Sequence, residues 1–210
     1  DTPERKESQS PSKRQKKGRY SLRDSEEREA KEDIEGQGEE DGSIRVIITG
    51  ITVTAKHKKM VESIGGELIE KVDDAIDATH AIAGDGKVPL RRTPKLMICV
   101  CKTPNILNLE WLTKSSKAKE PLHPKEFLLL NDTSAEKTYD FNMKDTLENG
   151  ETVRSQRGGL IGGWSIHFCK GVAGTKAPPE HELRLIVAAG GGMFLKTLSA
   201  RATKDVDASK

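Results

Sequence analysis

The stretch Val46-Ile47-Ile48-Thr49-Gly50 is an apolar run that ends in a threonine and a glycine. Such a run predicts a buried parallel strand whose carboxyl end carries a hydroxyl and a flexible backbone amide. Further along the chain, the stretch Arg91-Arg92-Thr93-Pro94-Lys95 predicts the start of a helix. Thr93 is a favoured N-cap residue, and Pro94 suits the first helical position. A strand end and a helix start therefore carry the polar groups that could form a binding site.

Lys95 falls in the first turn of that helix, where its positive charge opposes the helix dipole and costs energy unless an anion lies nearby. Ionised phosphate oxygens only accept hydrogen bonds, and they suit a hydroxyl, backbone amides and an ammonium group brought together. The sequence therefore predicts a phosphate-binding site, and it favours a phosphopeptide-binding module over an enzyme. Each residue type is also ordinary in a structural role: threonine at a strand end, glycine in a turn and lysine on a surface helix.

Short apolar and alternating runs predict the remaining secondary structure up to about residue 130. Strands are expected at residues 44–48, 67–71, 79–83 and 105–107, and helices at 55–64, from Thr93 onward and at 109–115. Gly65-Gly66 ends the first helix, with Gly65 in the left-handed conformation. This order with short links implies a small parallel sheet with helices on its faces. Trp111 lies on an amphipathic helix, which favours core packing over a role as a ligand platform.

The first part of the chain is strongly charged and has almost no large apolar side chains. Residues 1–23 carry eight Lys/Arg and three Asp/Glu, whereas residues 24–41 carry two and ten. Neither block can bury enough surface to offset its ordering entropy, so a disordered charged tail is expected over residues 1–42. Lys13-Arg14-Gln15-Lys16-Lys17 resembles a nuclear localisation signal, which would make importin a partner and the nucleus the location. A solvated basic tract without such a role is the alternative.

Several other classes of protein find little support in the sequence. No apolar run approaches the roughly 20 residues that cross a bilayer, and no apolar signal-peptide core is expected at the start. Gly84-Asp85-Gly86-Lys87 lacks the spacing of a nucleotide-binding loop, and the five histidines show no metal or triad pattern. Cys99 and Cys101 are expected to be buried free thiols. We expect no enzyme activity, no catalytic residue, no metal, no cofactor and no membrane partner.

Residues 43–130 resemble a BRCT domain. The resemblance is carried by Thr49-Gly50, Gly65-Gly66, Thr79-His80, Arg92-Thr93-x-Lys95 and Trp111, which follow one another at the spacing of that family. It implies an α/β fold with a four-stranded parallel sheet flanked by helices.

The later part of the chain resembles the continuation of paired BRCT repeats. Residues 131–157 resemble the inter-repeat linker, in which the aromatic pair Tyr139 and Phe141 precedes a short helix. Residues 158–210 resemble a partial second repeat: a strand over 160–168, a helix over 183–189, a glycine turn at 190–192 and a strand over 193–195. An incomplete sheet leaves an open edge, so this part should be poorly stable alone, and its packing against the first repeat is an open question.

The resemblance also implies roles for individual residues. Thr49 would give its hydroxyl, Gly50 its amide and Lys95 its ammonium to a phosphoserine, while Arg92 would hold the peptide main chain or a carboxylate terminus. Downstream residues of the ligand would be read in the groove between the repeats. The likeness is to DNA-damage mediators, whose partner is the phosphorylated tail of a damage-marking core histone. A phosphate-independent BRCT scaffold or a DNA-end-binding BRCT protein are the alternatives, although the acidic block makes direct DNA binding unlikely.

Overall fold

The computed structural model describes residues 43–174 and 177–198. The predicted tail over residues 1–42, with its importin-type basic stretch, lies outside this part, as do the last residues of the predicted second repeat. The described residues form one compact unit. Within the described part, no helix is both long and apolar enough to cross a membrane.

Four parallel strands form the main sheet, as the sequence predicts. They are β1 (Arg45–Ile48), β2 (Glu67–Ile69), β3 (His80–Gly84) and β4 (Ile106–Asn108), in the order β2-β1-β3-β4. In β1, Val46 pairs with Leu68 of β2 on one side and with His80 of β3 on the other. Because all strands run in the same direction, their carboxyl ends share one edge of the sheet, and β1 delivers Thr49 and Gly50 to that edge.

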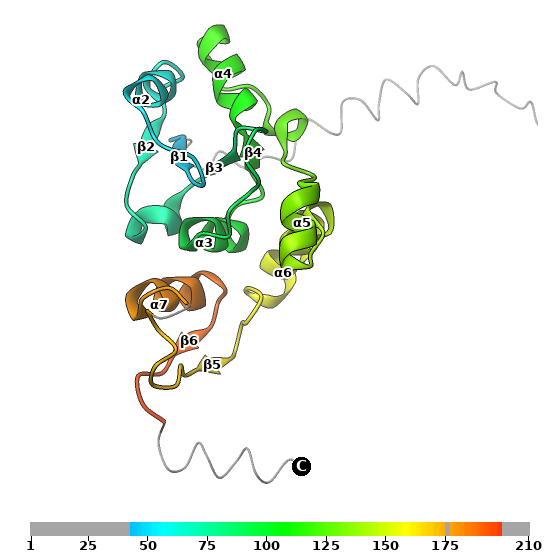
Figure 1. The fold of residues 1–210 in the computed structure, drawn as a ribbon. Helices are drawn as coiled ribbons and strands as arrows, with labels where there is room; N and C mark the ends of the chain where they lie inside the picture. Colours follow the sequence, from blue (N-terminus) through cyan, green and yellow to red (C-terminus); the bar gives the residue numbers. More distant parts are fainter. Residues whose placement is uncertain (1–42, 175–176, 199–210) are drawn as a thin grey trace, which may run out of the picture. The chain divides into compact units, whose positions relative to one another are not determined.

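Successive residues of β1 point to opposite faces of the sheet. Val46 and Ile48 pack with α2 (Ala55–Glu62) and α4 (Leu109–Ala118) in one apolar cluster, whereas Ile47 belongs to a second cluster on the other face. Figure 1 shows α2 and α4 on one side of the strands and α3 (Pro94–Lys102) on the other. The short 3-10 helix η1 (Asp73–Asp77), which the sequence analysis did not predict, packs against α3.

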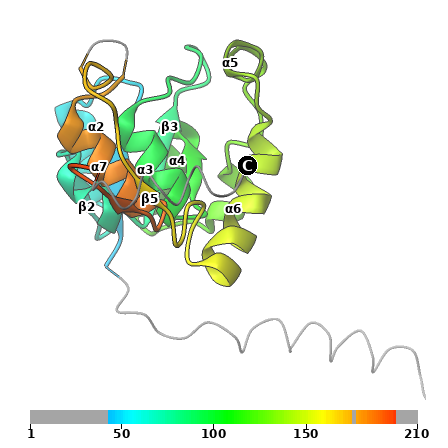
Figure 2. The same cartoon turned by 90° about the horizontal axis from the view of Figure 1, so that it is seen from below.

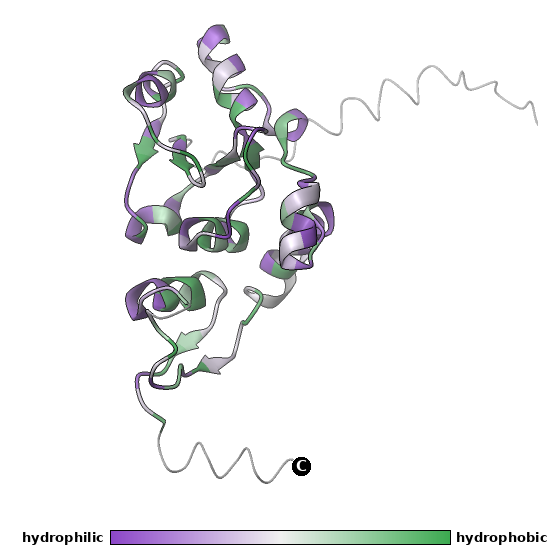
Figure 3. Cartoon of the chain, in the orientation of Figure 1, coloured by the Kyte–Doolittle hydropathy of each residue, from purple (hydrophilic) through white to green (hydrophobic). Residues whose placement is uncertain are grey.

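The turn after α2 explains the glycine pair. The helix ends at Glu62 with Ser63 as its C-cap, slightly earlier than predicted, and Gly65 adopts a left-handed φ of 72°. A Cβ on Gly66 would lie 3.1 Å from both the Ile44 carbonyl oxygen and Val61 Cγ1, so close approach of the backbone favours glycine there. Figure 3 shows the strands largely in the hydrophobic colour and α2 largely in the hydrophilic one.

Trp111 is fully buried on α4, which confirms that it packs in the core. Its indole Nε1 donates to the Leu122 carbonyl at 2.8 Å, just before the 3-10 helix η2 (Pro124–Phe127). The ring stacks on His80 with centroids 4.7 Å apart and an interplanar angle of 17°. The burial of His80 lowers its pKa from 6.5 to about 4, because a charged imidazolium would lose its hydration there.

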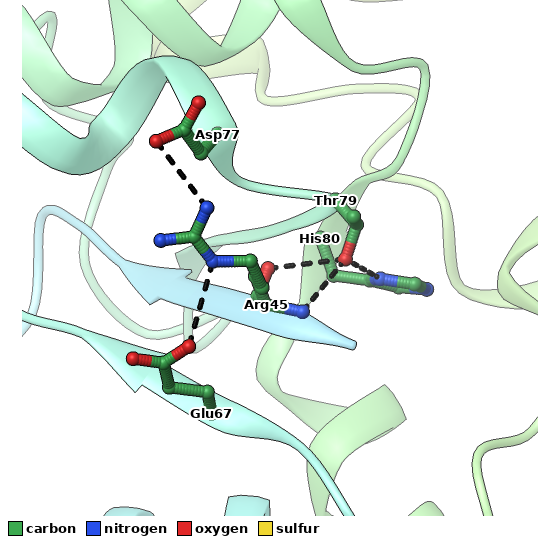
Figure 4. Close-up of polar contacts among 5 residues, drawn as sticks. All are labelled: Arg45, Glu67, Asp77, Thr79 and His80. Atoms are coloured by element: carbon green, nitrogen blue, oxygen red, sulfur yellow. Dashed lines mark hydrogen bonds and ion pairs between the residues drawn. The ribbon is translucent and has the colours of Figure 1, made fainter. Parts of the chain in front are cut away.

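The amino-terminal end of the sheet is tied together by Thr79 and Arg45 (Figure 4). The Arg45 amide donates to Thr79 Oγ1 at 2.9 Å, and the same hydroxyl lies 2.9 Å from His80 Nδ1. The Arg45 guanidinium lies 3.3 Å from Asp77 and 3.5 Å from Glu67. Among the described residues, its buried Nε has no hydrogen-bond partner, and the contact with Glu67 is an ion pair. The Thr79-His80 pair therefore has a structural role in joining β1 to β3.

Two helices follow the first repeat. They are α5 (Thr133–Tyr139) and α6 (Met143–Arg157), and α6 is 15 residues long, so the predicted short helix is in fact a long one. Asn142 caps α6 by accepting from the Asp145 amide at 2.9 Å. Arg154, near its other end, donates to the Val100 carbonyl of α3 at 2.9 Å. Helix α6 is thus held against the first repeat at α3.

The second repeat contributes β5 (Ser165–Ile166), α7 (Glu180–Ala189) and β6 (Met193–Phe194), with β5 and β6 parallel. The strand predicted over 160–168 is only two residues long, which corrects that expectation. The chain turns at residues 159–163, where Gly159 and Gly163 have φ values of 120° and 80° that exclude a regular strand. A Cβ on Gly159 would lie 2.4 Å from the Gly190 carbonyl oxygen, so this turn packs directly on the glycine turn after α7.

Packing between the repeats runs through helices. Helix α7 contacts α3 and η1, and Figure 1 and Figure 2 show α7 beside α3. Leu183, Val187 and Ala189 are buried, and Ala189 belongs to the same apolar cluster as Ile98 of the first repeat. The described part of the second repeat therefore shares a core with the first, which answers the question that the sequence left open.

Cysteines follow the expected pattern only in part. Cys99 is buried and Cys101 half-buried, both as free thiols in α3, whereas Cys169 is exposed. Burial raises the pKa of Cys99 to about 12, so this thiol stays protonated and behaves as an apolar side chain.

Candidate phosphate-binding site

The carboxyl end of β1 meets the start of α3 through two hydroxyls. Thr49 Oγ1 lies 2.5 Å from Thr93 Oγ1, and either atom can donate. Thr93 Oγ1 also accepts from the Leu96 amide at 3.2 Å, as expected of the N-cap of α3. Thr49 is only 3% exposed, and its amide donates to Ile82 at 2.9 Å in continuation of the sheet. A strand end and a helix start that are distant in the sequence are thereby joined at one point.

Gly50 occupies the position that only glycine takes easily. Its φ is 78°, and a Cβ there would lie 3.4 Å from the Ala83 carbonyl oxygen and 3.9 Å from the Arg91 amide nitrogen. Gly50 therefore lies beside the Arg91-Arg92-Thr93 segment. Within residues 43–174 and 177–198, no group accepts a hydrogen bond from the Gly50 amide, so this donor is available to a ligand.

Lys95 lies in the first turn of α3, as predicted. Its half-buried side chain donates to the carbonyl of Glu70, which follows the end of β2. In the described part of the chain, no carboxylate lies within 4.0 Å of the ammonium group. Its positive charge is therefore unpaired at a helix start, where the dipole makes an anion favourable. The Glu70 carbonyl directs Lys95 toward the neighbouring strand end, and the structure does not bring its ammonium into contact with Thr49.

Arg92 is exposed, and its guanidinium carbon lies 5.4 Å from the centre of the Tyr139 ring. Such a distance is typical of a cation–π contact. Sequence analysis assigned Arg92 to the site but gave Tyr139 no part in it. The only sequence feature that pointed to Tyr139 was the aromatic pair in the predicted linker, and the sequence does not indicate which residue this pair contacts.

An apolar hollow of about 240 Å³ begins at this pair. Apolar side chains of α3 and of the segment after α5 line it, including Met97, Val100 and Met143. Leu160, which is 71% exposed, closes part of the hollow from the second repeat. The hollow could bury an apolar side chain that follows a group bound at Arg92.

A second hollow, of about 500 Å³, lies elsewhere on the carboxyl edge of the sheet, around the Gly84-Asp85-Gly86-Lys87 loop. The Asp85 carboxylate accepts from the amides of Lys87 and Val88 at 3.0 and 3.2 Å, and the bond from Lys87 is the main reason that the pKa of Asp85 is lowered. This loop is a side-chain-stabilised turn. Among the described residues, no group of His, Cys, Asp and Glu could hold a metal ion.

Comparison with solved structures identifies the fold. The paired BRCT5-BRCT6 domains of S. pombe Brc1 superimpose with a TM-score of 0.58 at 18% identity, over 80% of this chain and 73% of that one. The fold is therefore that of a tandem BRCT module, as the sequence predicts.

The sequence of the chain is similar to that of DNA-damage checkpoint mediators. Mediator of DNA damage checkpoint protein 1 from Rattus norvegicus is 30% identical over 154 residues, which cover 73% of this chain, and the human and mouse proteins are 29% identical over the same length. The chain is therefore a tandem BRCT module by its fold, and over about three quarters of its length it is similar to a segment of these DNA-damage checkpoint mediators. It spans only 11% of the rat relative's length and 6% of the human relative's. The chain matches no protein-family model.

Proposed function

We propose that this chain is a phosphoserine-peptide-binding module in a nuclear DNA-damage response or repair scaffold. The observation that carries the proposal is the meeting of Thr49 with Thr93 at the start of α3, beside the free Gly50 amide. Hydroxyl, amide and ammonium donors at a helix start suit an ionised phosphate, which carries a charge of about −1.5 to −2 at neutral pH.

Proton placement in the hydroxyl pair decides whether Thr49 can donate. Thr93 Oγ1 already accepts from the Leu96 amide, so its own proton can go to Thr49 Oγ1. In that arrangement the Thr49 proton is free for a phosphate oxygen. In the reverse arrangement Thr49 donates to Thr93, so the free proton is that of Thr93 and Thr49 has none left for the ligand. A bound phosphate favours the first arrangement because an anion attracts the free proton.

Lys95 would add the charge. Its ammonium group has three donors, so the bond to the Glu70 carbonyl leaves two for phosphate oxygens. Each charge-assisted hydrogen bond contributes roughly 1.5–3 kcal/mol. Bonds from Thr49, Gly50 and Lys95 would together be enough to separate a phosphorylated peptide from a plain one.

Arg92 and the apolar hollow would read the residues that follow the phosphoserine. The guanidinium would hold the peptide main chain or a terminal carboxylate, and the hollow beside it would bury an apolar side chain. A phosphorylated C-terminal tail of a damage-marking core histone fits both features. The likeness to checkpoint mediators supports a role in the DNA-damage response and a nuclear location, and importin would act through residues 13–17.

The experiment is a binding measurement with one serine peptide in phosphorylated and unphosphorylated form. We expect at least tenfold tighter binding of the phosphorylated peptide, and a much smaller difference between the two peptides in Thr49→Val. Equal affinities for the two forms would contradict the proposal and favour a phosphate-independent scaffold. Tight binding of plain DNA with a steep salt dependence would instead favour the DNA-end reading. We propose that the chain binds the peptide and does not catalyse a reaction of it.

A further inference from the structure

Arg92 carries a long, exposed side chain that no carboxylate holds among the described residues. An unrestrained arginine of this kind loses much rotamer freedom when it binds a ligand. The contact that it does make is with the Tyr139 ring, 5.4 Å from guanidinium carbon to ring centre. The Tyr139 ring therefore lies where it can hold the Arg92 guanidinium.

Helix α5 is fastened at both ends, so Tyr139 is not free to drift. At its start, Asp132 accepts from the Ala135 amide at 2.9 Å as the N-cap, and its other oxygen accepts from the Leu90 amide at 2.7 Å. Leu90 is buried and lies two residues before Arg92. One carboxylate thus joins the start of α5 to the segment that carries Arg92.

The other end of α5 is fixed to the buried start of α6. Glu136 accepts from the Met143 amide at 2.8 Å, and Met143 is 1% exposed. Asp140 closes the helix in the left-handed conformation, with a φ of 53°. Tyr139, between these anchors, is 36% exposed, which leaves its ring available to the guanidinium.

We infer that Tyr139 is a positioning residue for ligand binding: its ring holds the Arg92 guanidinium beside the apolar hollow before the ligand arrives. This inference rests on the proposed function, because it takes the phosphopeptide as the ligand of Arg92. Tyr139 acts through the π face of its ring, so phenylalanine can replace it. Its hydroxyl is not required, and an aliphatic side chain of similar size is not a substitute.

The test is a double-mutant cycle read with a phosphoserine peptide that ends in a free carboxylate a few residues downstream. Tyr139→Leu keeps an apolar wall for the hollow but removes the ring face, and it should weaken binding about two- to fivefold. Tyr139→Phe should bind like wild type. In an Arg92→Ala background, Tyr139→Leu should have no further effect. An equal loss from Tyr139→Leu with and without Arg92 would show that Tyr139 acts only as a wall of the hollow, and would overturn the inference.

A ligand-free measurement separates this inference from the proposed function. The ring current of Tyr139 should shift the side-chain proton resonances of Arg92 upfield in wild type and in Tyr139→Phe, and this shift should vanish in Tyr139→Leu. Unchanged Arg92 resonances in Tyr139→Leu would overturn the inference even if the phosphopeptide binds. Equal binding of phosphorylated and plain peptide would overturn the proposed function. The Arg92 resonances would still show whether Arg92 lies over the Tyr139 ring. Thermal melting of each variant controls for loss of fold.

Discussion

Thr49 at the end of β1 and Thr93 at the start of α3 share a hydrogen bond of 2.5 Å between their hydroxyl oxygens. Thr93 simultaneously caps α3 through the Leu96 amide. One hydroxyl therefore stabilises the helix start and orients the side chain that we propose to meet phosphate. A substitution at either threonine should therefore alter the hydrogen bonding of the other.

Thr49→Val should weaken binding of the phosphorylated peptide by about 1.5–3 kcal/mol and leave the unphosphorylated form almost unchanged. Valine keeps the shape and the β-branching that suit the strand, but it removes the hydroxyl. Isothermal titration at two salt concentrations measures the effect. Thr49→Ser, which keeps the hydroxyl, is the matched control and should retain most of the affinity. Wild-type affinity in Thr49→Val at both salt concentrations would rule out this pocket.

Lys95→Met should weaken phosphopeptide binding at least tenfold, or about 1.4 kcal/mol, while the fold stays intact. The ammonium has no carboxylate partner among the described residues and opposes the dipole of α3, so its removal costs the helix little. Lys102→Met, at the other end of the same helix, is the control and should bind normally. Affinity of the Lys95 variant within twofold of wild type would contradict a role in binding.

Trp111→Ala should destabilise the first repeat by about 3–5 kcal/mol, a large share of a small domain's stability. The substitution opens a cavity under α4, removes the stacking partner of His80, and leaves the Leu122 carbonyl without its donor. Trp111→Phe keeps a ring in place and should cost less. Chemical denaturation monitored by circular dichroism gives both values. Near-wild-type unfolding of the alanine variant would mean that the indole does not support the core.

His80 should make stability depend on pH. Its folded pKa of about 4 lies below the ordinary 6.5, so the unfolded chain takes up this proton at a higher pH than the folded one. The contribution of neutral His80 to the free energy of unfolding is complete above about pH 6.5 and is lost as the pH falls toward about 4. The free energy of unfolding then falls by up to about 1.4 kcal/mol per pH unit. Denaturation of wild type and His80→Phe from about pH 4.5 to pH 7 isolates this term. Parallel stability curves for the two proteins would show that His80 does not titrate as described.

Much of the first repeat could be predicted from the sequence because its signals are local. The continuous apolar run of β1 indicates a strand buried on both faces, with Ile47 and Ile48 on opposite faces, and the Thr93-Pro94 pair marks the start of α3. Gly65 can adopt its left-handed conformation because it has no side chain. The second repeat was harder to predict. Residues 160–168 look apolar enough for a strand, but the close approach of the Gly159 and Gly190 turns leaves only Ser165–Ile166 to pair.

The sequence by itself determined the four-stranded parallel sheet, the buried Trp111 and the residue types at the candidate site. It did so because helix caps, side-chain periodicity and glycine conformations depend on neighbours along the chain. Only the tertiary structure decided that Thr49 bonds to Thr93, that Lys95 donates to Glu70 and that Arg92 faces Tyr139. These pairs join segments that are distant in the sequence. Their partners are chosen by the packing of the sheet, α3 and α5, and no local pattern encodes that packing.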